Sequence, residues 1–548
     1  MEKLGCTCPD FNFKNVWDGV VDYFRRCKAN IPSKGKSADN AGTNEIETGV
    51  YEVHKTPNFL PPQSSSETDN STVIYKALWS FEARAEDELS FKKGDQFKIL
   101  ERSPTGDWWK AERIDRNGEA KATGFVPHNY LARQEAVDSQ PWYFGKLNRF
   151  ETQSLLMAPG NEVGAFLVRQ SEKEDVGCVL SVKVSEKEVT HFKVHEDEEG
   201  GFFVDQNDTF SSLGELVEFY RTNFMGSNTK LKEPCMRPEP KPQDLSHITV
   251  DDWELPKNQF SLEEQLGSGY FADVYRGKWK GMVNVAIKIL KNNDTLDHKE
   301  FQLETQILKK LRHRHLISLF AICTDTTPFY IITELMEKGN LLYFLRGQEG
   351  RSLDFMALTD MASQVADGMA YLESQNSIHR DLAARNVLVG GDCICKVADF
   401  GLARVIKEPF YESEDKTIPY KWSAPEAISH GRFSNKSDVW SFGVLLYEIF
   451  SYGGAPYPTY SNHEVFRLIS SGYRMPSPLN CPDHIYDIMH LCWKGPPNER
   501  PDFRELKPLL EEAGRYSDWT GEYDSDTADP PEGSNEKNQP LEKAETES

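Results

Sequence analysis

A short polar stretch in the second half of the chain most constrains its fold and chemistry. It reads His379-Arg380-Asp381-Leu382-Ala383-Ala384-Arg385-Asn386, and Asp399-Phe400-Gly401 begins 13 residues after Asn386. A carboxylate that can accept a hydroxyl proton, an amide that can bind a metal and a second carboxylate for that metal therefore follow one another closely. This set is typical of in-line phosphoryl transfer. A chance polar loop is the alternative, but the other parts that such a site requires occur upstream in workable order.

Length and charge limit the classes of protein to consider. The chain has 548 residues, enough for several domains, and 38% of them are hydrophobic, which is ample material for cores. Its 63 Lys and Arg against 86 Asp and Glu give a formal net charge of -23, which disfavours nucleic acid as the main partner. The ten cysteines match no four-ligand zinc spacing, and reduced thiols in a cytoplasmic protein fit best. No apolar run is long enough to span a bilayer, and no signal-peptide core is present.

Residues 1–72 are expected to form a leader that contains an amphipathic helix and a flexible linker. Apolar residues recur at three- and four-residue steps and precede a basic end: Phe13, Val16, Trp17, Val20, Val21, Phe24, Arg25, Arg26 and Lys28. Such a helix either lies on an anionic membrane or docks on another domain. Glu2 stands where N-myristoylation requires glycine, so S-acylation of Cys6, Cys8 or Cys27 is the remaining route to a lipid anchor.

Residues 73–133 combine short strand-like runs with turns. The motifs are Ala77-Leu78-Trp79-Ser80-Phe81, Asp107-Trp108-Trp109 and Gly124-Phe125-Val126-Pro127-His128-Asn129-Tyr130. They resemble an SH3 domain, a small β-barrel that binds proline-rich peptides in the polyproline II conformation. The resemblance implies a groove made of Trp79, Phe81, Trp108, Pro127 and Tyr130, with Glu88 or its neighbours receiving a basic ligand residue. The family usually has Tyr at the positions of Trp79 and Phe81, a change that affects ligand affinity rather than fold.

Residues 140–236 resemble an SH2 domain, an α+β fold. Trp142-Tyr143-Phe144-Gly145 begins it, and Arg169 follows the apolar run Phe166-Leu167-Val168. A guanidinium at the end of a buried strand is costly unless it meets an anion, and its planar fork fits two phosphate oxygens. Pairing with a local carboxylate is the alternative. The resemblance implies phosphotyrosine binding by Arg149, Arg169, Ser171, His191 and Lys193.

The linker, residues 237–259, contains Pro238, Pro240 and Pro242 at alternate positions, which favours an extended conformation. It is either a plain spacer or an intramolecular ligand of the SH3 domain. Trp253 matches a family tryptophan at the entrance to the next domain.

Residues 260–513 resemble a protein tyrosine kinase, with a β-rich N-lobe and an α-rich C-lobe. The motifs are Gly267-Ser268-Gly269-Tyr270-Phe271-Ala272-Asp273-Val274 and, downstream, Val285-Ala286-Ile287-Lys288. Glycines let the backbone lie close to phosphates. Ala272 replaces the third glycine of the family pattern, which leaves ATP binding in place but can weaken it. The implied ATP-binding residues are Leu266, Gly267, Ser268, Gly269, Tyr270, Phe271, Ala272, Val274, Ala286, Lys288, Thr333, Glu334 and Met336.

The resemblance also assigns catalytic roles. Lys288 would hold the α- and β-phosphates and Glu304, rather than Glu300, would hold Lys288 in place. Asp381 would accept the proton of the substrate hydroxyl, and Arg385 would help to place the acceptor ring. Asn386 and Asp399 would bind magnesium, or manganese as an alternative. Glu426 and Arg500 match a structural ion pair.

Two motifs favour tyrosine over serine or threonine as the acceptor: the run Leu382-Ala383-Ala384-Arg385-Asn386, and Ile418-Pro419-Tyr420-Lys421-Trp422 before Ala424-Pro425-Glu426. Tyr411 matches the activation-loop tyrosine, and its phosphate would pair with Arg380 or Arg404. The acidic tail, residues 514–548, is predicted to be disordered and regulatory. Its inhibitory site would be Tyr523, or Tyr516, bound in the SH2 pocket while the linker fills the SH3 groove.

The order SH3, SH2, kinase and tail tyrosine resembles the Src-like non-receptor tyrosine kinases, most closely the Brk/Frk branch. The predicted function is therefore that of a non-specific protein-tyrosine kinase in signal transduction, using ATP and acting on protein tyrosines. Expected partners are phosphotyrosine peptides and proline-rich peptides. The expected location is the cytoplasm, with peripheral contact with the plasma membrane and presence in the nucleus left open. A catalytically dead SH3-SH2 scaffold and a serine/threonine kinase are the alternatives.

Overall fold

The computed structural model describes residues 73–514 apart from short gaps. These gaps are 104–106, 116, 135, 172–176, 198–199, 206, 226–228, 241–243, 250–252, 269–271, 292–294, 392, 401–403, 406–410 and 413–417, and the backbone alone is described for 295–300, 303, 404–405 and 411–412. All described residues belong to one compact unit, Ser71–Ser548. The predicted leader helix, Cys6, Cys8, Cys27, Tyr516 and Tyr523 lie outside them. Within the described part of the chain, no helix is both long and apolar enough to cross a membrane.

The first domain is a small antiparallel barrel built around Phe97, which is fully buried. Its strands pair in the order β4-β3-β2-β1-β5. Successive strand side chains point to opposite faces, so Trp108 is buried whereas its neighbour Trp109 is half-buried against Tyr75. The elements are β1 (Ile74–Ala77), β2 (Gln96–Arg102), β3 (Trp108–Ile114), β4 (Ala120–Pro127), η1 (His128–Tyr130) and β5 (Leu131–Arg133).

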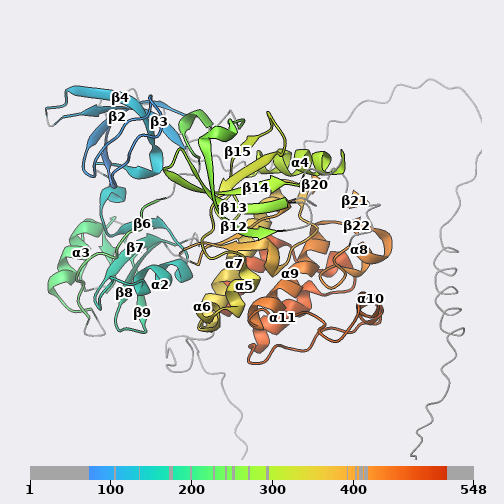
Figure 1. Cartoon of the computed structure of the whole chain (residues 1–548). Helices are drawn as coiled ribbons and strands as arrows, with labels where there is room; N and C mark the ends of the chain where they lie inside the picture. The colour runs from blue at the N-terminus through green and yellow to red at the C-terminus, as the bar shows by residue number, and fades with distance from the viewer. Residues whose placement is uncertain are drawn as a thin grey trace, which may run out of the picture. The chain divides into compact units, whose positions relative to one another are not determined.

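The second domain is a central sheet with a helix on each face (Figure 1). Strand β7 alternates between the two faces: Phe166 and Val168 pack with helix α3, and Leu167 packs with helix α2. Arg169 therefore shares the α2 face with Leu167. The elements are η2 (Val137–Ser139), β6 (Tyr143–Lys146), α2 (Arg149–Met157), β7 (Phe166–Gln170), β8 (Cys178–Lys183), β9 (Val189–Lys193), β10 (His195–Glu196), β11 (Phe202–Phe203) and α3 (Leu213–Thr222).

The third domain begins with a five-stranded antiparallel sheet, in the order β12-β13-β14-β16-β15, and a helix, α4. On β14, Val285 and Ile287 are fully buried in the core of this lobe, so Ala286 and Lys288 face the other side of the sheet. The elements are β12 (Phe260–Ser268), β13 (Ala272–Trp279), β14 (Val283–Leu290), α4 (Thr295–Leu308), β15 (Leu319–Cys323) and β16 (Tyr330–Glu334), and the linker before them contains η3 (His247–Thr249) and η4 (Lys257–Gln259).

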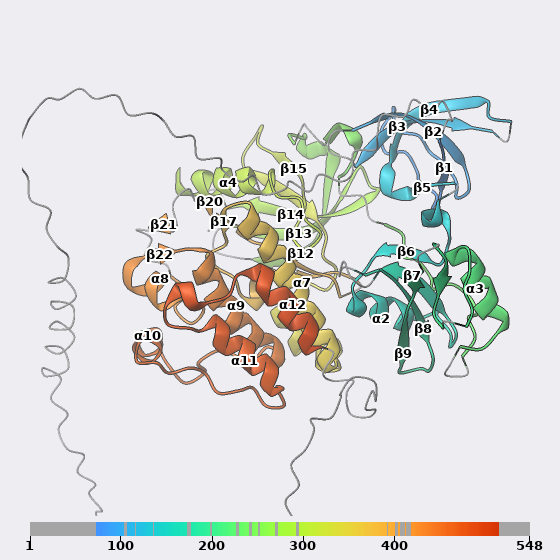
Figure 2. The same cartoon turned by 180° about the vertical axis from the view of Figure 1, so that it is seen from behind.

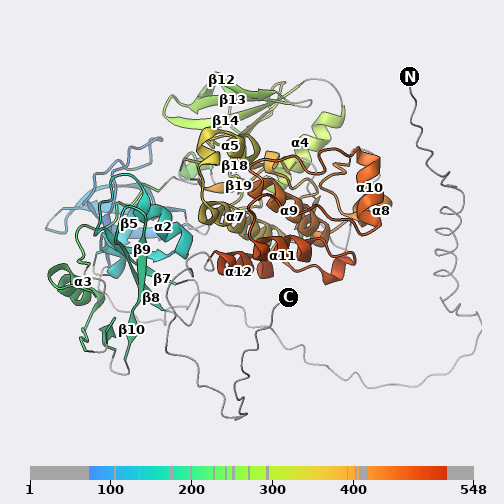
Figure 3. The ribbon, with the colours of Figure 1, turned by 90° about the horizontal axis from the view of Figure 1, so that it is seen from below.

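The rest of the third domain is mostly helical. Helices α7, α9, α11 and α12 pack on one another (Figure 2), and strands β12, β13 and β14 lie to one side of them (Figure 3). The helices are α5 (Leu341–Arg346), α6 (Gln348–Arg351), α7 (Phe355–Ser374), η5 (Ala384–Asn386), α8 (Pro425–His430), α9 (Asn435–Phe450), α10 (Asn462–Ser470), α11 (Asp483–Cys492), η7 (Pro497–Glu499) and α12 (Phe503–Ala513). Short strand pairs are β17 (Ser377–Ile378) with β20 (Arg404–Val405), β18 (Val387–Val389) with β19 (Cys395–Val397), and β21 (Tyr411–Glu412) with β22 (Arg432–Phe433).

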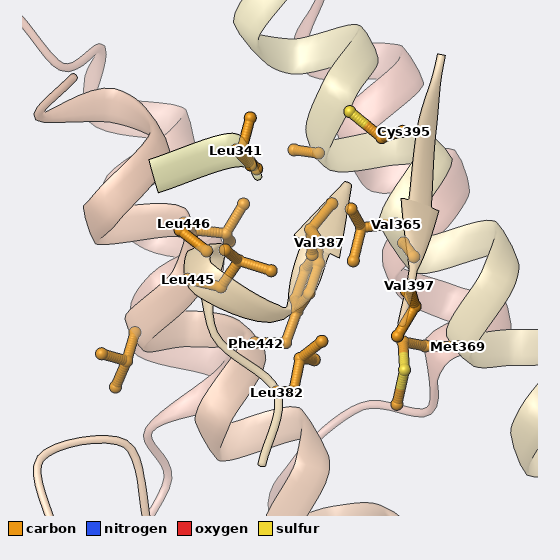
Figure 4. Close-up of a cluster of buried hydrophobic side chains, with 14 of the residues drawn as sticks. Leu341, Val365, Met369, Leu382, Val387, Cys395, Val397, Phe442, Leu445 and Leu446 are labelled. Atoms are coloured by element: carbon orange, nitrogen blue, oxygen red, sulfur yellow. The ribbon is translucent and has the colours of Figure 1, made fainter. Parts of the chain in front are cut away.

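One hydrophobic cluster fixes the loop that carries the polar stretch. Leu382, which follows Asp381 directly, points into it together with Val387 and Val397 from the β18–β19 hairpin (Figure 4). Met369 of α7 and Phe442 of α9 close the cluster from the two main helices. Because these side chains are buried, the loop between them is held rigidly on the helical lobe.

Candidate active site and ligand pockets

Lys288 and Glu304 meet where the sheet faces helix α4. The Lys288 Nζ donates to both carboxylate oxygens of Glu304 at 2.8 Å, and Asp399 Oδ1 lies 3.6 Å from the same nitrogen. Burial alone would lower the pKa of Lys288, but the attraction of Glu304 and Asp399 outweighs it and raises that pKa. The lysine is therefore a positive charge held in place between the sheet and helix α4. The side chain of Glu300 is not among those described.

Asp381 lies at the centre of a second group on the helical lobe. Arg385 contacts its carboxylate, and the Asn386 Nδ2 donates to Asp381 Oδ2 at 2.8 Å and to its backbone oxygen at 2.7 Å. Burial raises the pKa of Asp381, and Arg385 opposes this rise. The guanidinium of Arg385 also lies 4.4 Å from the ring centroid of Trp422. Arg385 and Asn386 together hold the carboxylate in one orientation.

Two acids on helix α9 support this loop, and neither was predicted from the sequence. Asp438 accepts the backbone N–H of His379 at 2.7 Å and that of Arg380 at 2.9 Å. Glu448 accepts the backbone N–H of Ala384 at 2.9 Å and the indole N–H of Trp422 at 3.0 Å. A signal was present, since two carboxylates in a nearly apolar helix are costly unless they are paired.

Oxygen ligands suitable for a hard cation are present beside Asp381. Both described side-chain hydrogen bonds of Asn386 use its amide nitrogen, which leaves the amide oxygen for a cation. Asp399 has a φ of 62° and a side chain that is 55% exposed. Among the described residues no group of three or more His, Cys, Asp or Glu could hold a metal.

Most of the predicted nucleotide-binding residues lie on strands β12, β13, β14 and β16 of the same sheet as Lys288. In the sheet Gly267 pairs with Val274, Ala272 with Leu290, and Ala286 with Thr333. Ala272 is 7% exposed, so its methyl group packs within the sheet. Gly269, Tyr270 and Phe271 lie outside the described residues. The remaining predicted positions, Leu266, Ser268, Lys288, Glu334 and Met336, lie on β12, β14, β16 and the segment after β16.

Glu334 has a structural side chain. Its Oε1 accepts the backbone N–H of Ser318 at 2.8 Å and the Nζ of Lys396 at 2.7 Å. These bonds leave the backbone of residues 334–336 as the part that could meet an adenine edge.

The pocket predicted to bind phosphotyrosine brings Arg169, Arg149 and His191 together. Arg169 is 6% exposed and donates to the backbone oxygen of Leu147 at 3.0 Å. Burial, with the positive charges of Arg149 and Arg169, lowers the pKa of His191 to about 3, so this histidine is neutral. A buried cluster of positive charge beside a neutral imidazole suits a doubly charged anion.

The other two predicted pocket residues lie next to this cluster. Lys193 pairs in the sheet with Val179, which in turn pairs with Arg169, so the lysine and the arginine project from the same face. Ser171 follows β7 directly and donates its backbone N–H to Gly177 at 2.8 Å.

The predicted SH3 groove is present as a cluster of aromatic rings. Phe81 lies 5.9 Å from Trp108 and 5.7 Å from Tyr130, and Trp79 lies 6.1 Å from Tyr130, measured between ring centroids. Pro127 pairs with Trp108 in the sheet. Phe81, Trp108, Pro127 and Tyr130 are buried, whereas Trp79 is half-buried. Part of the groove is covered by the linker, since the Tyr130 hydroxyl donates to Glu239 at 2.9 Å.

The predicted regulatory tyrosine of the activation loop is described by its backbone alone. Tyr411 pairs with Phe433 in the β21–β22 ribbon, and the guanidinium of Arg380 lies 4.5 Å from the ring centroid of Phe433. The structural ion pair forms as expected from the sequence, because Arg500 donates to both carboxylate oxygens of Glu426 at 2.6 and 2.9 Å.

Two lobes, one with a lysine paired to a carboxylate and the other with an aspartate held by an arginine and an asparagine, are the arrangement typical of protein kinases. Comparison with known proteins agrees. Residues 260–510 match the family described as protein tyrosine and serine/threonine kinase, residues 142–220 match the SH2 domain, and residues 76–128 match the SH3 domain.

Three relatives match most of the chain. Protein-tyrosine kinase 6 of Mus musculus is 48% identical over 442 residues, which cover 81% of this chain and 96% of that protein. The Homo sapiens protein of the same name is 48% identical over 446 residues, covering 81% and 97%. Tyrosine-protein kinase FRK of Homo sapiens is 43% identical over 476 residues, covering 82% and 94%.

The chain belongs to the non-receptor tyrosine kinases with SH3, SH2 and kinase domains, in the branch that contains protein-tyrosine kinase 6 and FRK. The predicted fold, domain order and family are thereby confirmed. A kinase domain implies the use of ATP and a divalent metal, and the two smaller domains imply binding of phosphotyrosine and of proline-rich peptides. A dead scaffold is not favoured.

Proposed function

We propose that this chain transfers the γ-phosphate of ATP to tyrosine hydroxyls of protein substrates. The observation that carries the proposal is the Lys288–Glu304 ion pair, with Nζ 2.8 Å from both carboxylate oxygens, across the interlobe site from a half-buried Asp381. A lysine held by a carboxylate is positioned to bind phosphate oxygens, and alignment with charge stabilisation accounts for most of the acceleration in such reactions.

The residues divide the chemistry between them. Lys288 binds the α- and β-phosphates, and the backbone of the Gly267 strand covers them. Asp381 orients the tyrosine hydroxyl and accepts its proton; its raised pKa makes it a better acceptor than an exposed aspartate. Arg385, stacked on Trp422, places the phenol ring.

Asn386 and Asp399 are proposed to hold magnesium, because their oxygens are hard ligands and lie beside Asp381 and Lys288. When bound, the cation offsets the charge of the phosphate oxygens.

Regulation is proposed to act through three contacts. Phosphate on Tyr411 would lie on the same ribbon as Phe433, close to the guanidinium of Arg380, and would order the activation loop. The linker, 237–259, would occupy the SH3 groove, as the Tyr130–Glu239 hydrogen bond supports. Phosphorylated Tyr523 would occupy the pocket of Arg169, and tethering would strengthen both weak contacts.

The chain is proposed to work in the cytoplasm. Its three domains are proposed to span residues 73–133, 140–236 and 260–513. Peripheral membrane contact through the leader is proposed to depend on Cys6, Cys8 or Cys27 together with its basic end.

The test is incubation of the full chain with ATP, magnesium and a poly-Glu-Tyr polymer. We expect phosphotyrosine on the polymer, lost in Asp381→Asn and retained in Asp325→Asn, a control at an exposed loop aspartate. A phosphate-free polymer would favour a scaffold, and phosphoserine on a mixed substrate would favour a serine/threonine kinase.

A further inference from the structure

Neighbouring residues of the linker contact different domains, some the kinase N-lobe and others the SH3 domain. Asp244 is 3% exposed and accepts from Arg312 of the kinase domain twice at 3.3 Å. Leu245 is fully buried in the core of the N-lobe. Ser246 and His247 contact the SH3 domain instead. We call residues 244–249 the linker turn, because they lie in tight succession between the two domains.

Ser246 presents a buried hydroxyl to a buried carboxylate. Its side chain is fully buried, and its Oγ donates to Glu88 Oε1 at 2.5 Å. The second carboxylate oxygen of Glu88 accepts the backbone N–H of Arg84 at 2.7 Å. Burial alone would raise the pKa of Glu88, but the hydrogen bonds from His247, Ser246 and Arg84 outweigh it and lower that pKa. The carboxylate is therefore charged and requires donors.

His247 fills the space beside the same carboxylate. Its Nε2 lies 2.8 Å from Asp87 Oδ2, and its Nδ1 lies 3.8 Å from Glu88 Oε1. Its ring stacks on Phe125 with centroids 3.9 Å apart and planes 10° apart, and it meets Trp108 edge-on at 6.1 Å. The imidazole thus lies against both the acidic residues and the aromatic residues at this end of the groove.

The backbone of the linker turn is not that of a polyproline ligand. Residues 247–249 form a 3-10 helix, and the Thr249 hydroxyl donates to the backbone oxygen of Ser246 at 2.8 Å. Residues 244–249 contain no proline. The proline-containing part of the linker lies elsewhere, where Glu239 accepts from Tyr130 and Pro238 lines a cavity with Trp79. The two ends of the groove therefore recognise different chemistry.

We propose that the Asp87–Glu88 end of the SH3 groove selects a serine or threonine followed by histidine, presented in a tight turn with a free hydroxyl. Partner proteins that carry such a pair, beside or without a proline-rich segment, compete with Ser246 and His247 and release the linker. The proposal rests on the proposed occupation of the groove by the linker. A phosphate on the hydroxyl would place about two negative charges against Asp87 and Glu88, so a phosphorylated pair is rejected.

The first test measures how open the groove is in the full chain. A fluorescent peptide with the sequence of residues 238–249 is titrated into each variant, and anisotropy is followed. Ser246→Ala and His247→Ala should each bind it about tenfold more tightly than the unchanged chain, because one hydrogen bond to a charged group is lost from the internal ligand. Ser246→Thr, which keeps a hydroxyl, should restore the closed state.

The matched control is Ile248→Ala, at the exposed neighbour on the same turn, which should bind as weakly as the unchanged chain. Unaltered binding of a phosphotyrosine peptide to the SH2 domain shows that each variant is folded. The double variant Pro238→Ala with Pro240→Ala distinguishes failure of this inference from failure of the proposed SH3–linker contact. If these proline changes open the groove and the Ser246 and His247 changes do not, the linker is the ligand but the inference is wrong. If neither set opens it, the proposed SH3–linker contact fails as well.

The second test measures selectivity in the opened full chain carrying both Ser246→Ala and His247→Ala. Three peptides of residues 238–249 are compared: unmodified, with alanine at the serine position, and with phosphoserine there. We expect the alanine peptide to bind about tenfold more weakly than the unmodified one and the phosphoserine peptide to bind more weakly still. Equal affinities for all three would overturn the proposal.

Discussion

Asp438 accepts the backbone N–H of His379 at 2.7 Å, although the two residues lie 59 positions apart in the chain. The other carboxylate oxygen accepts the N–H of Arg380, whose φ is 71°. This left-handed conformation is strained for an arginine, and the two hydrogen bonds stabilise it. Asp381 follows directly, so a carboxylate on helix α9 fixes the backbone from which the Asp381 side chain projects.

Asp438→Asn should therefore reduce kcat by about tenfold or more, because an amide can replace only part of the acceptor capacity of the buried carboxylate. We expect KM for the polymer to change less than kcat, since the loop is displaced without loss of the substrate surface. Steady-state kinetics and the melting temperature check this, with the exposed Asp487→Asn on helix α11 as the matched control. An unchanged kcat in a folded Asp438→Asn protein would contradict the positioning role.

Glu304→Gln should lower kcat/KM for ATP by one to two orders of magnitude, roughly the effect of losing a charge-assisted ion pair that holds Lys288. The side chain keeps its length, so the change tests charge rather than packing. The measurement is the dependence of the rate on ATP concentration. Glu264→Gln, at an exposed position of β12, is the control and should behave like the unchanged chain. Equal values for the two variants would argue against the ion pair.

The pH profile of kcat should show an acid limb above the ordinary range of an aspartate. Burial raises the pKa of Asp381, so the carboxylate takes up its proton at a higher pH than an exposed one would. As the pH falls through this raised pKa, the proton acceptor is lost and kcat falls. The same group has the opposite effect on stability, because protonation removes the cost of a buried charge. A rate that stays constant down to the pKa of a free aspartate would exclude Asp381 as the acceptor.

Arg169→Lys should weaken phosphotyrosine-peptide binding by about 100-fold, because a lysine cannot make the two parallel bonds of a guanidinium. His191→Asn should have a much smaller effect, since the pKa of His191 is lowered to about 3 and the neutral ring adds no positive charge to those of Arg149 and Arg169. Fluorescence titration of the full chain measures both, with exposed Lys187→Ala as the control. Similar losses for Arg169→Lys and His191→Asn would contradict this division of roles.

Much of the architecture could be predicted from contiguous sequence motifs. Contacts between segments that are distant in the sequence could not. The run before Arg169 placed that residue at the end of a buried strand, and Phe166, Leu167 and Val168 are indeed fully buried on β7. Asp438 and Glu448 were missed because their partners are backbone groups far away in sequence.

The linker shows the same limit. Its prolines indicated an extended ligand, but Ser246 and His247 match no polyproline pattern. Their role depends on a carboxylate 158 residues away from Ser246. Only a folded chain brings those groups together.

Arg312 connects the SH3 domain and the linker turn to the segment that follows helix α4. It donates to Asp107 of the SH3 domain at 2.7 Å and to Asp244 of the linker turn, and it lies four residues beyond the end of helix α4, which carries Glu304. Detaching the SH3 domain would remove Asp107 from this guanidinium and leave Asp244, which stays with the kinase lobe beside the buried Leu245. The end of helix α4 would then lose one of its contacts, so a protein bound to the SH3 domain would change how firmly Glu304 holds Lys288.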